Sequence, residues 1–194
     1  YDPASLPVGP AFLKKPENAP LISRLRAENN MQFLEGSSGS YRGYVEKNIV
    51  GSHNDISSEY GWRELRARYL ANITLVDDMV GMIVDSLEKQ GLLDDTIIVF
   101  TSEHGEMAGD HGMLEKRSMY DESARVPMII RAPKIGTEKS VVSGNFSHVD
   151  LVPTLLDLLD VKVPPGLDGK SVAEVLEGGE NLRNNEVFVE WNGI

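Results

Sequence analysis

The sequence predicts an α/β fold in which helices flank a mainly parallel sheet. From Trp62 to Gln90, apolar residues recur at spacings of three and four, which indicates one amphipathic helix. The run Thr96 to Phe100 that follows is short, continuous, apolar and rich in β-branched residues, as is typical of a strand buried on both faces of a parallel sheet. A second such run spans Val126 to Arg131. Helix and strand therefore alternate as they do in βαβ units.

The first sixty residues differ in character from the rest. Five prolines fall within the first twenty positions, and Gly- and Ser-rich stretches follow at Gly36–Ser40 and Gly51–Asp55. We interpret residues 1–60 as an extended, loop-rich connector with short helices, for example near Leu21 to Ala27, and residues 61–194 as the α/β domain. The connector lies over the surface or, alternatively, helps to form a binding cleft, since long loops in compact domains are often functional.

The ends of several elements can also be placed. Gly91 is expected to cap the long helix at its C-terminus. Residues Asp150 to Leu159 have apolar positions at helical spacing, and Pro153 is compatible with that helix because proline is tolerated in the first turn. The run Val187 to Trp191 predicts a last strand.

Composition limits the classes of function. The chain has 194 residues, of which 41% are hydrophobic and 25% charged, as is ordinary for a globular protein. A net charge of −11 argues against a nucleic-acid partner, because phosphate backbones are bound by clustered Lys and Arg. There is no cysteine, hence no disulfide, and no apolar stretch approaches the ~20 residues that span a bilayer. Because the chain begins with Tyr and has no signal peptide, we expect it to be a fragment.

The segment from Thr101 to Pro133 concentrates the chemically reactive side chains. It places two histidines, a group of acids and a Lys-Arg pair between two apolar runs. Charged groups near a core must be paired or bound to something, so this density indicates function rather than stability. The other two histidines, His53 and His148, lack such surroundings, and we interpret them as surface or hydrogen-bonded histidines.

Four short motifs in this segment resemble, in their order and spacing, the C-terminal half of the sulfatase catalytic domain, within the alkaline-phosphatase-like superfamily. They are Thr101–Gly105, Gly109–Gly112, Lys116–Arg117 and Tyr120–Pro127. Weaker resemblance extends to Tyr1–Pro3 with Leu6–Pro7 and to Val149–Leu156. The resemblance implies an alkaline-phosphatase-like fold, incomplete here, of which this chain supplies the C-terminal portion.

By this resemblance, Glu103 and His104 match the pair that binds the divalent cation of sulfatases. The first member is usually Asp in the family, and the longer Glu side chain favours Ca²⁺ over Mg²⁺, because Ca²⁺ accepts longer and less regular coordination. Two groups cannot hold a cation alone, so further oxygen ligands are expected outside this chain. Asp77 and Asp78 are adjacent acids, but helical neighbours point roughly 100° apart, and we interpret them as helix-face residues.

The resemblance also assigns candidate catalytic residues. Lys116 matches the lysine that binds a sulfate oxygen and neutralises charge on the transferring group, with a merely solvated lysine as the alternative. His111 either donates a proton to the leaving alkoxide or shapes the loop by hydrogen bonding. Tyr120, Glu122 and Arg125 are expected to fix the loop through an ion pair near the start of the second strand.

The implied reaction is hydrolysis of a sulfate ester on a sulfated small molecule or glycan. Sulfatases use a formylglycine nucleophile made from Cys or Ser in a Cys/Ser-x-Pro/Ala-x-Arg motif, and the chain lacks this motif. We therefore expect the nucleophile to lie outside the chain, and the fragment to be inactive by itself. The alternatives are a phosphonate or phosphate monoester hydrolase and a non-catalytic binding module. Self-association through an exposed core face is expected. The compartment stays open, with a periplasmic or secreted location suggested by the resemblance alone.

Overall fold

The computed structural model describes residues 1–32, 34, 56–135, 141–178, 182 and 186–190. The chain divides into two compact units. Unit 1 comprises Tyr1–Ile83 and Glu103–Val126, and unit 2 comprises Val84–Ser102 and Pro127–Ile194. The boundary that the sequence suggested at residue 60 stays a prediction, and much of the second half of that connector, with His53, lies outside the described residues.

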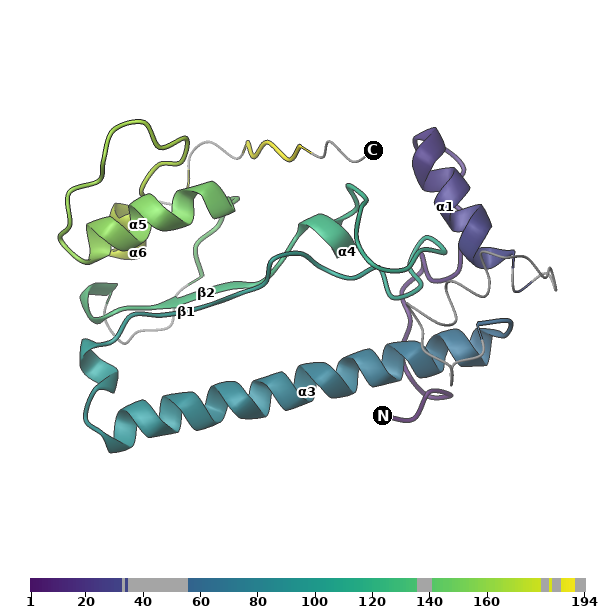
Figure 1. Ribbon diagram of the computed structural model, residues 1–194, viewed down its shortest axis with the longest axis horizontal. Coiled ribbons are helices and arrows are strands. Elements are labelled where there is room, and N and C mark those ends of the chain that lie inside the picture. Colours follow the sequence, from purple (N-terminus) through teal and green to yellow (C-terminus); the bar gives the residue numbers. More distant parts are fainter. Residues whose placement is uncertain (33, 35–55, 136–140, 179–181, 183–185, 191–194) are drawn as a thin grey trace. The chain divides into compact units, whose positions relative to one another are not determined.

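The described residues form five α-helices and two strands (Figure 1). The helices are α1 (Leu21–Met31), α3 (Glu59–Lys89), α4 (Asp121–Ala124), α5 (Leu151–Leu158) and α6 (Ala173–Leu176). The strands are β1 (Ile98–Thr101) and β2 (Met128–Arg131). Short 3-10 turns occupy Leu93–Asp95, Pro133–Ile135 and His148–Asp150.

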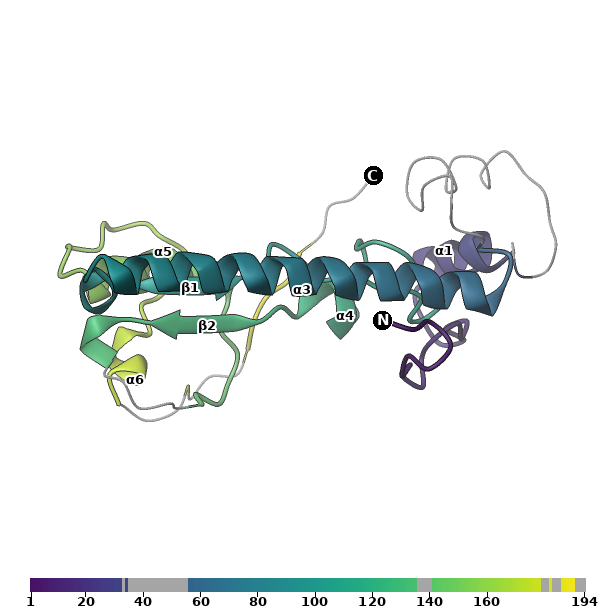
Figure 2. The ribbon, with the colours of Figure 1, turned by 90° about the horizontal axis from the view of Figure 1, so that it is seen from below.

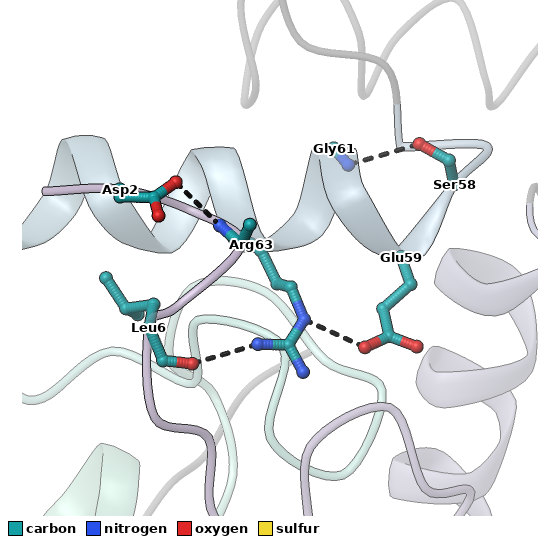
Figure 3. A network of polar contacts seen from close by, with 7 residues as sticks. Asp2, Leu6, Ser58, Glu59, Gly61 and Arg63 are labelled. Carbon is teal, nitrogen blue, oxygen red and sulfur yellow. Dashed lines mark hydrogen bonds and ion pairs between the residues drawn. The ribbon is translucent and has the colours of Figure 1, made fainter.

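The long helix α3 confirms the predicted helix and its Gly91 cap, but it begins at Glu59, three residues before the start that the sequence suggested. At its start the Ser58 hydroxyl accepts a hydrogen bond from the Gly61 N–H at 3.1 Å, as N-cap side chains do (Figure 3). At its end Gly91 has φ +69°, and the Leu92 N–H donates to Leu87 O at 2.9 Å. The left-handed glycine followed by this bond is the Schellman motif, which provides donors to the last carbonyls of the helix.

The core of unit 1 lies at the N-terminal end of α3. Trp62 is fully buried, and its indole N–H donates to Ile56 O at 2.9 Å. The buried residues packed with it are Phe12, Ile56 and Leu114. Figure 3 shows how Arg63 joins the N-terminal segment to this end of α3, with its guanidinium donating to Leu6 O at 2.9 Å and to Glu59 at 2.8 Å.

Farther along α3 the apolar stripe is exposed. The buried residues of the helix are Gly61, Trp62 and Ala67, all near its start. Four of the stripe residues that follow are exposed, Tyr69 by 38%, Val76 by 48%, Ile73 by 49% and Ile83 by 60%, whereas Val80, Val84 and Leu87 are half-buried. The predicted helix is thus present, but most of its apolar face meets no core within the described part of this chain.

The sheet of unit 2 corrects one expectation. β1 and β2 pair antiparallel, with Ile98 opposite Arg131 and Thr101 opposite Met128. The two strands lie side by side in Figure 1, and Figure 2 shows the arrow of β2. The expected parallel arrangement is therefore wrong for this pair. A parallel pair needs a long crossover, usually a helix, whereas the helix between these strands, α4, has four residues. The strands are also half-buried rather than buried on both faces, and Ile129 is 62% exposed.

Unit 2 has its own small core, in which Ala132, Leu158 and Ala173 are buried. The half-buried residues packed against them are Ile97, Ile130, Ile135 and Leu176. Pro153 lies in the first turn of α5, as predicted. The predicted strand at the C-terminal end is wrong for residues 187–190, which form no strand, and Trp191 lies outside the described residues. No helix in the described ranges has the length and apolar character needed to cross a membrane.

Candidate active site

The four predicted site residues lie on one segment of unit 1, Glu103–Arg117, named here the site loop. Glu103 and Lys116 are exposed, and His104 and His111 are half-buried. No hydrogen bond or ion pair joins Lys116 to Glu103 or to His111 within the described residues. The loop therefore exposes Glu103 and Lys116 to solvent near its two ends rather than pairing them with one another.

The backbone around His104 fixes its ring. His104 Nδ1 lies 2.8 Å from Gly105 O, and a carbonyl oxygen only accepts, so in the neutral imidazole Nδ1 carries the proton and Nε2 carries the lone pair. Gly105 in turn donates its N–H to Ser123 O at 2.8 Å. A Cβ at Gly105 would lie 1.9 Å from Glu122 O, so only glycine fits this turn. An imidazole held by its other nitrogen is the usual form of a histidine metal ligand.

The donor chemistry at Glu103 and His104 fits part of a cation site. An exposed carboxylate and an imidazole with its Nε2 lone pair are adjacent in the chain, and a carboxylate is an oxygen donor of the kind that Ca²⁺ prefers. The described residues contain no group of three or more His, Cys, Asp or Glu side chains that could hold a metal ion. The metal-ligand assignment stays a prediction, and Asp77 and Asp78 are exposed on α3.

A carboxylate that the sequence did not single out closes the site loop. Glu106 Oε1 accepts the Ala108 N–H at 3.1 Å and the Glu115 N–H at 2.7 Å. The Met107 N–H also donates to Glu115 O at 2.8 Å. Glu106 thus joins the two ends of the loop next to Lys116. In the sequence it is one acid among several, and nothing distinguishes it before the backbone donors are in place.

Left-handed backbone is concentrated in the same loop. Four of the six non-glycine residues with positive φ in the described chain belong to it: Ala108, His111, Glu115 and Arg117. Each costs on the order of 1 to 2 kcal/mol in an L-residue, and such strain gathers at functional sites because the surroundings must enforce it. Lys116 lies between two of these residues. Its position is therefore set by the braced loop and not by local preference.

His111 is held by a backbone bond and a ring contact. Its N–H donates to Ala11 O at 2.8 Å, and its imidazole stacks on Tyr120, with centroids 3.8 Å apart and planes 15° from parallel. Tyr120 itself packs against a buried cluster that includes Met107 and Met113. These contacts favour the loop-shaping alternative for His111, and its catalytic role stays a prediction.

The structure also tests the ion pair expected at Arg125 and the interpretation of His148. The ion pair expected at Arg125 is present, but Asp121 supplies the carboxylate, at 3.7 Å, rather than Glu122. Both side chains are more than four-fifths exposed, so the pair contributes little stability. His148, in unit 2, lies with Nε2 3.4 Å from Thr101 Oγ1, which agrees with a hydrogen-bonded histidine.

Comparison with known proteins identifies the family. The family described as Sulfatase matches residues 17–161. An N-acetylglucosamine-6-O-sulfatase of Bacteroides thetaiotaomicron is 46% identical over 109 residues, which cover 56% of this chain and 20% of that protein. The chain thus spans about a fifth of the length of this relative.

Solved structures give the same result. One, described as a complex with its substrate D-glucosamine-2-N,6-O-disulfate, is 34% identical with a TM-score of 0.63 and covers 79% of this chain and 32% of its own. A phosphonate monoester hydrolase from Silicibacter pomeroyi is 31% identical with a TM-score of 0.70, and the match covers 95% of this chain and 34% of that one. The chain has the corresponding part of an alkaline-phosphatase-like fold. It belongs to the sulfatase family.

Proposed function

We propose that this chain is the C-terminal portion of the catalytic domain of a sulfatase that hydrolyses sulfate esters. The observation that carries the proposal is the site loop, which presents Glu103, His104 and Lys116 from one strained and internally bonded segment. A loop that stores strain to place exposed charged groups needs a reason other than stability. Membership of the sulfatase family supplies that reason.

Glu103 and His104 are proposed to bind the divalent cation, Ca²⁺ in preference to Mg²⁺. His104 would use Nε2, since Nδ1 is directed to Gly105 O, and Glu103 would use its exposed carboxylate. A bound cation would draw negative charge from the sulfate group toward itself. The residual ligands are proposed to come from outside these 194 residues.

Lys116 is proposed to bind a sulfate oxygen and to neutralise the charge that develops as the S–O bond breaks. The chain carries a net charge of −11, so an anionic group needs a local cation to approach it. Lys116 is exposed, and the described residues offer it no ion pair, so its ammonium can meet an anion without first breaking a contact. His111 is proposed either as the proton donor to the leaving alcohol or as a loop-shaping residue.

The nucleophile, formylglycine in sulfatases, is proposed to lie outside this chain, and the chain alone is proposed to be inactive. A sulfated small molecule or glycan is the proposed substrate class. Two comparisons support a sulfated sugar, one through the name of the matched protein and one through the disulfated glucosamine in the matched structure. A binding cleft that accepts such a substrate needs the rest of the domain as its other wall.

The test uses Lys116→Met in the full-length gene product. With an aryl sulfate as substrate, kcat/KM should fall by about 10²- to 10³-fold, the usual loss when one charge-stabilising group is removed from a transition state. The matched control is Lys162→Met, an exposed lysine of unit 2 without a proposed role, which should stay within about twofold of the parent. Unchanged kcat/KM in Lys116→Met would remove Lys116 from the site.

A phosphonate or phosphate monoester hydrolase is the second candidate, favoured by the match of 95% of this chain to the phosphonate monoester hydrolase. Parallel assays of sulfate and phosphonate esters on the full-length product separate the two candidates. Turnover of neither ester would favour the third, a non-catalytic binding module derived from a sulfatase.

A further inference from the structure

Asp110 is a buried acid at the turn of the site loop, and no role has been assigned to it so far. Its side chain is 9% exposed, and Oδ2 lies 3.2 Å from Arg66 Nη1. The other oxygen, Oδ1, is buried and has no hydrogen-bond partner among the described residues. Burying a carboxylate that is only half satisfied is unfavourable compared with an apolar side chain of similar size. The sequence therefore keeps a charge here at a loss of stability.

The backbone of Asp110 is the point where the N-terminal segment meets the site loop. Phe12 and Asp110 form an antiparallel bridge. On one side of it the Leu13 N–H donates to Gly109 O at 2.9 Å, and on the other the His111 N–H donates to Ala11 O at 2.8 Å. These bonds fix the left-handed conformation of His111, the residue that follows Asp110.

The partner of Asp110 is attached to a rigid element. Arg66 belongs to α3, and its guanidinium lies over the Phe12 ring, 5.7 Å from the centroid. A Cβ at Gly109 would meet the same ring at 2.6 Å, so the loop and the ring are in close contact there. The ion pair thus ties the loop to the helix at a position where the loop backbone has no room to slide.

The loop's own hydrogen bonds connect this anchor to Lys116. The Asp110 N–H donates to Met107 O at 2.8 Å, and the Met107 N–H donates to Glu115 O, also at 2.8 Å. Glu115 precedes Lys116 in the chain. A displacement of Asp110 is therefore passed through two backbone bonds to the residue that carries the proposed sulfate-binding ammonium.

We propose that Arg66 and Asp110 form a positioning pair for the site loop, which sets the placement of His111 and Lys116 without contacting the substrate. The inference rests on the proposed function where it concerns catalysis, but its structural half can be measured separately. Groups in an active site must be held within a fraction of an ångström, and anchoring to a helix provides that accuracy better than a loop alone.

The test compares Asp110→Asn, which keeps the shape and removes the charge, with Arg66→Lys, which keeps the charge and loses the fork of donors. The matched control is Glu64→Gln, which breaks the exposed Arg68–Glu64 pair on the same helix. Amide hydrogen exchange at His111 and Leu13 is followed by NMR in this chain. In the full-length gene product, kcat and KM for an aryl sulfate are measured, with kcat expressed per folded molecule.

In Asp110→Asn, the amides of His111 and Leu13 should exchange hydrogen at least about tenfold faster than in the parent, and kcat per folded molecule should fall at least about tenfold. Arg66→Lys should give intermediate values of both quantities. Glu64→Gln should leave both unchanged. A purely structural role would lower the melting temperature while leaving kcat per folded molecule unchanged, and that result overturns the proposal, as does unchanged exchange. If Asp110→Asn does not fold, Arg66→Lys decides by the same two readouts. If the parent protein hydrolyses no ester, the proposed function fails, and the exchange result alone decides whether the pair fixes the loop.

Discussion

The site loop and the middle of α3 differ in opposite directions in the regularity of their backbone and in how well they are packed. The loop is irregular and strained, yet a carboxylate, an ion pair and several backbone bonds hold it. The middle of α3 has unstrained helical geometry, yet its apolar stripe is exposed. Regular backbone therefore does not mark the part of this chain that is best packed. Tertiary contacts hold the loop, whereas the middle of the helix has regular backbone bonds but little packing of its apolar stripe.

Substitution of large apolar residues in the two regions should give the largest difference. Trp62→Ala, at the buried end of α3, removes a fully buried ring and its bond to Ile56 O, and should lower the free energy of unfolding by about 3 to 5 kcal/mol. Urea denaturation followed by circular dichroism measures the change. The same cavity should loosen the site loop, because Leu114 packs in the same cluster.

The matched control is Ile73→Ala in the exposed stripe. Ile73 is 49% exposed, so its truncation should change the free energy of unfolding by about 1 kcal/mol or less. Self-association through this stripe stays a prediction, and dependence of the Ile73→Ala effect on protein concentration would reveal it. Equal losses for the two substitutions would contradict the contrast between the regions.

The same contrast explains what the sequence could and could not predict. Helix α3, its Gly91 cap and the proline-tolerant start of α5 were predictable, because spacing, caps and first-turn proline act within a few residues. The direction of β2 relative to β1 was not, since an apolar run shows burial but not its partner.

The candidate site likewise has residues that the sequence could predict and residues that it could not. Glu103, His104, His111 and Lys116 could be named from their motifs. The groups that hold them, Glu106 and the pair of Arg66 with Asp110, could not, because their partners are 9 and 44 positions away along the chain and become visible only when the loop has folded.

Glycine substitutions give a second, smaller difference. Gly105→Ala in the site loop would place a Cβ 1.9 Å from a backbone oxygen that cannot rotate away, and should lower the free energy of unfolding by about 1 to 3 kcal/mol. Gly81→Ala in α3 meets nothing within 4 Å and should raise it by about 0.5 to 1 kcal/mol, because alanine restricts the unfolded chain more than glycine does. Thermal unfolding of both variants checks the opposite signs. A stabilised Gly105→Ala protein would mean that the turn beside His104 has another conformation.

Tyr69 gives the smallest expected effect. It lies in the apolar stripe of α3, but its pKa is affected by Glu106 of the site loop. Partial burial, and secondarily the negative charge of Glu106, raise the pKa of its phenol above the ordinary value of 10.0. The folded protein then holds the phenol proton more tightly than the unfolded chain does. Stability from this group is therefore complete below about pH 10 and is lost as the pH rises through the folded-state pKa. Between about pH 8 and about pH 10.5, the melting temperature of the parent should fall slightly more than that of Tyr69→Phe. Identical pH profiles for the parent and Tyr69→Phe would contradict the raised pKa of Tyr69 and, with it, the partial burial and the nearby Glu106 charge that cause it.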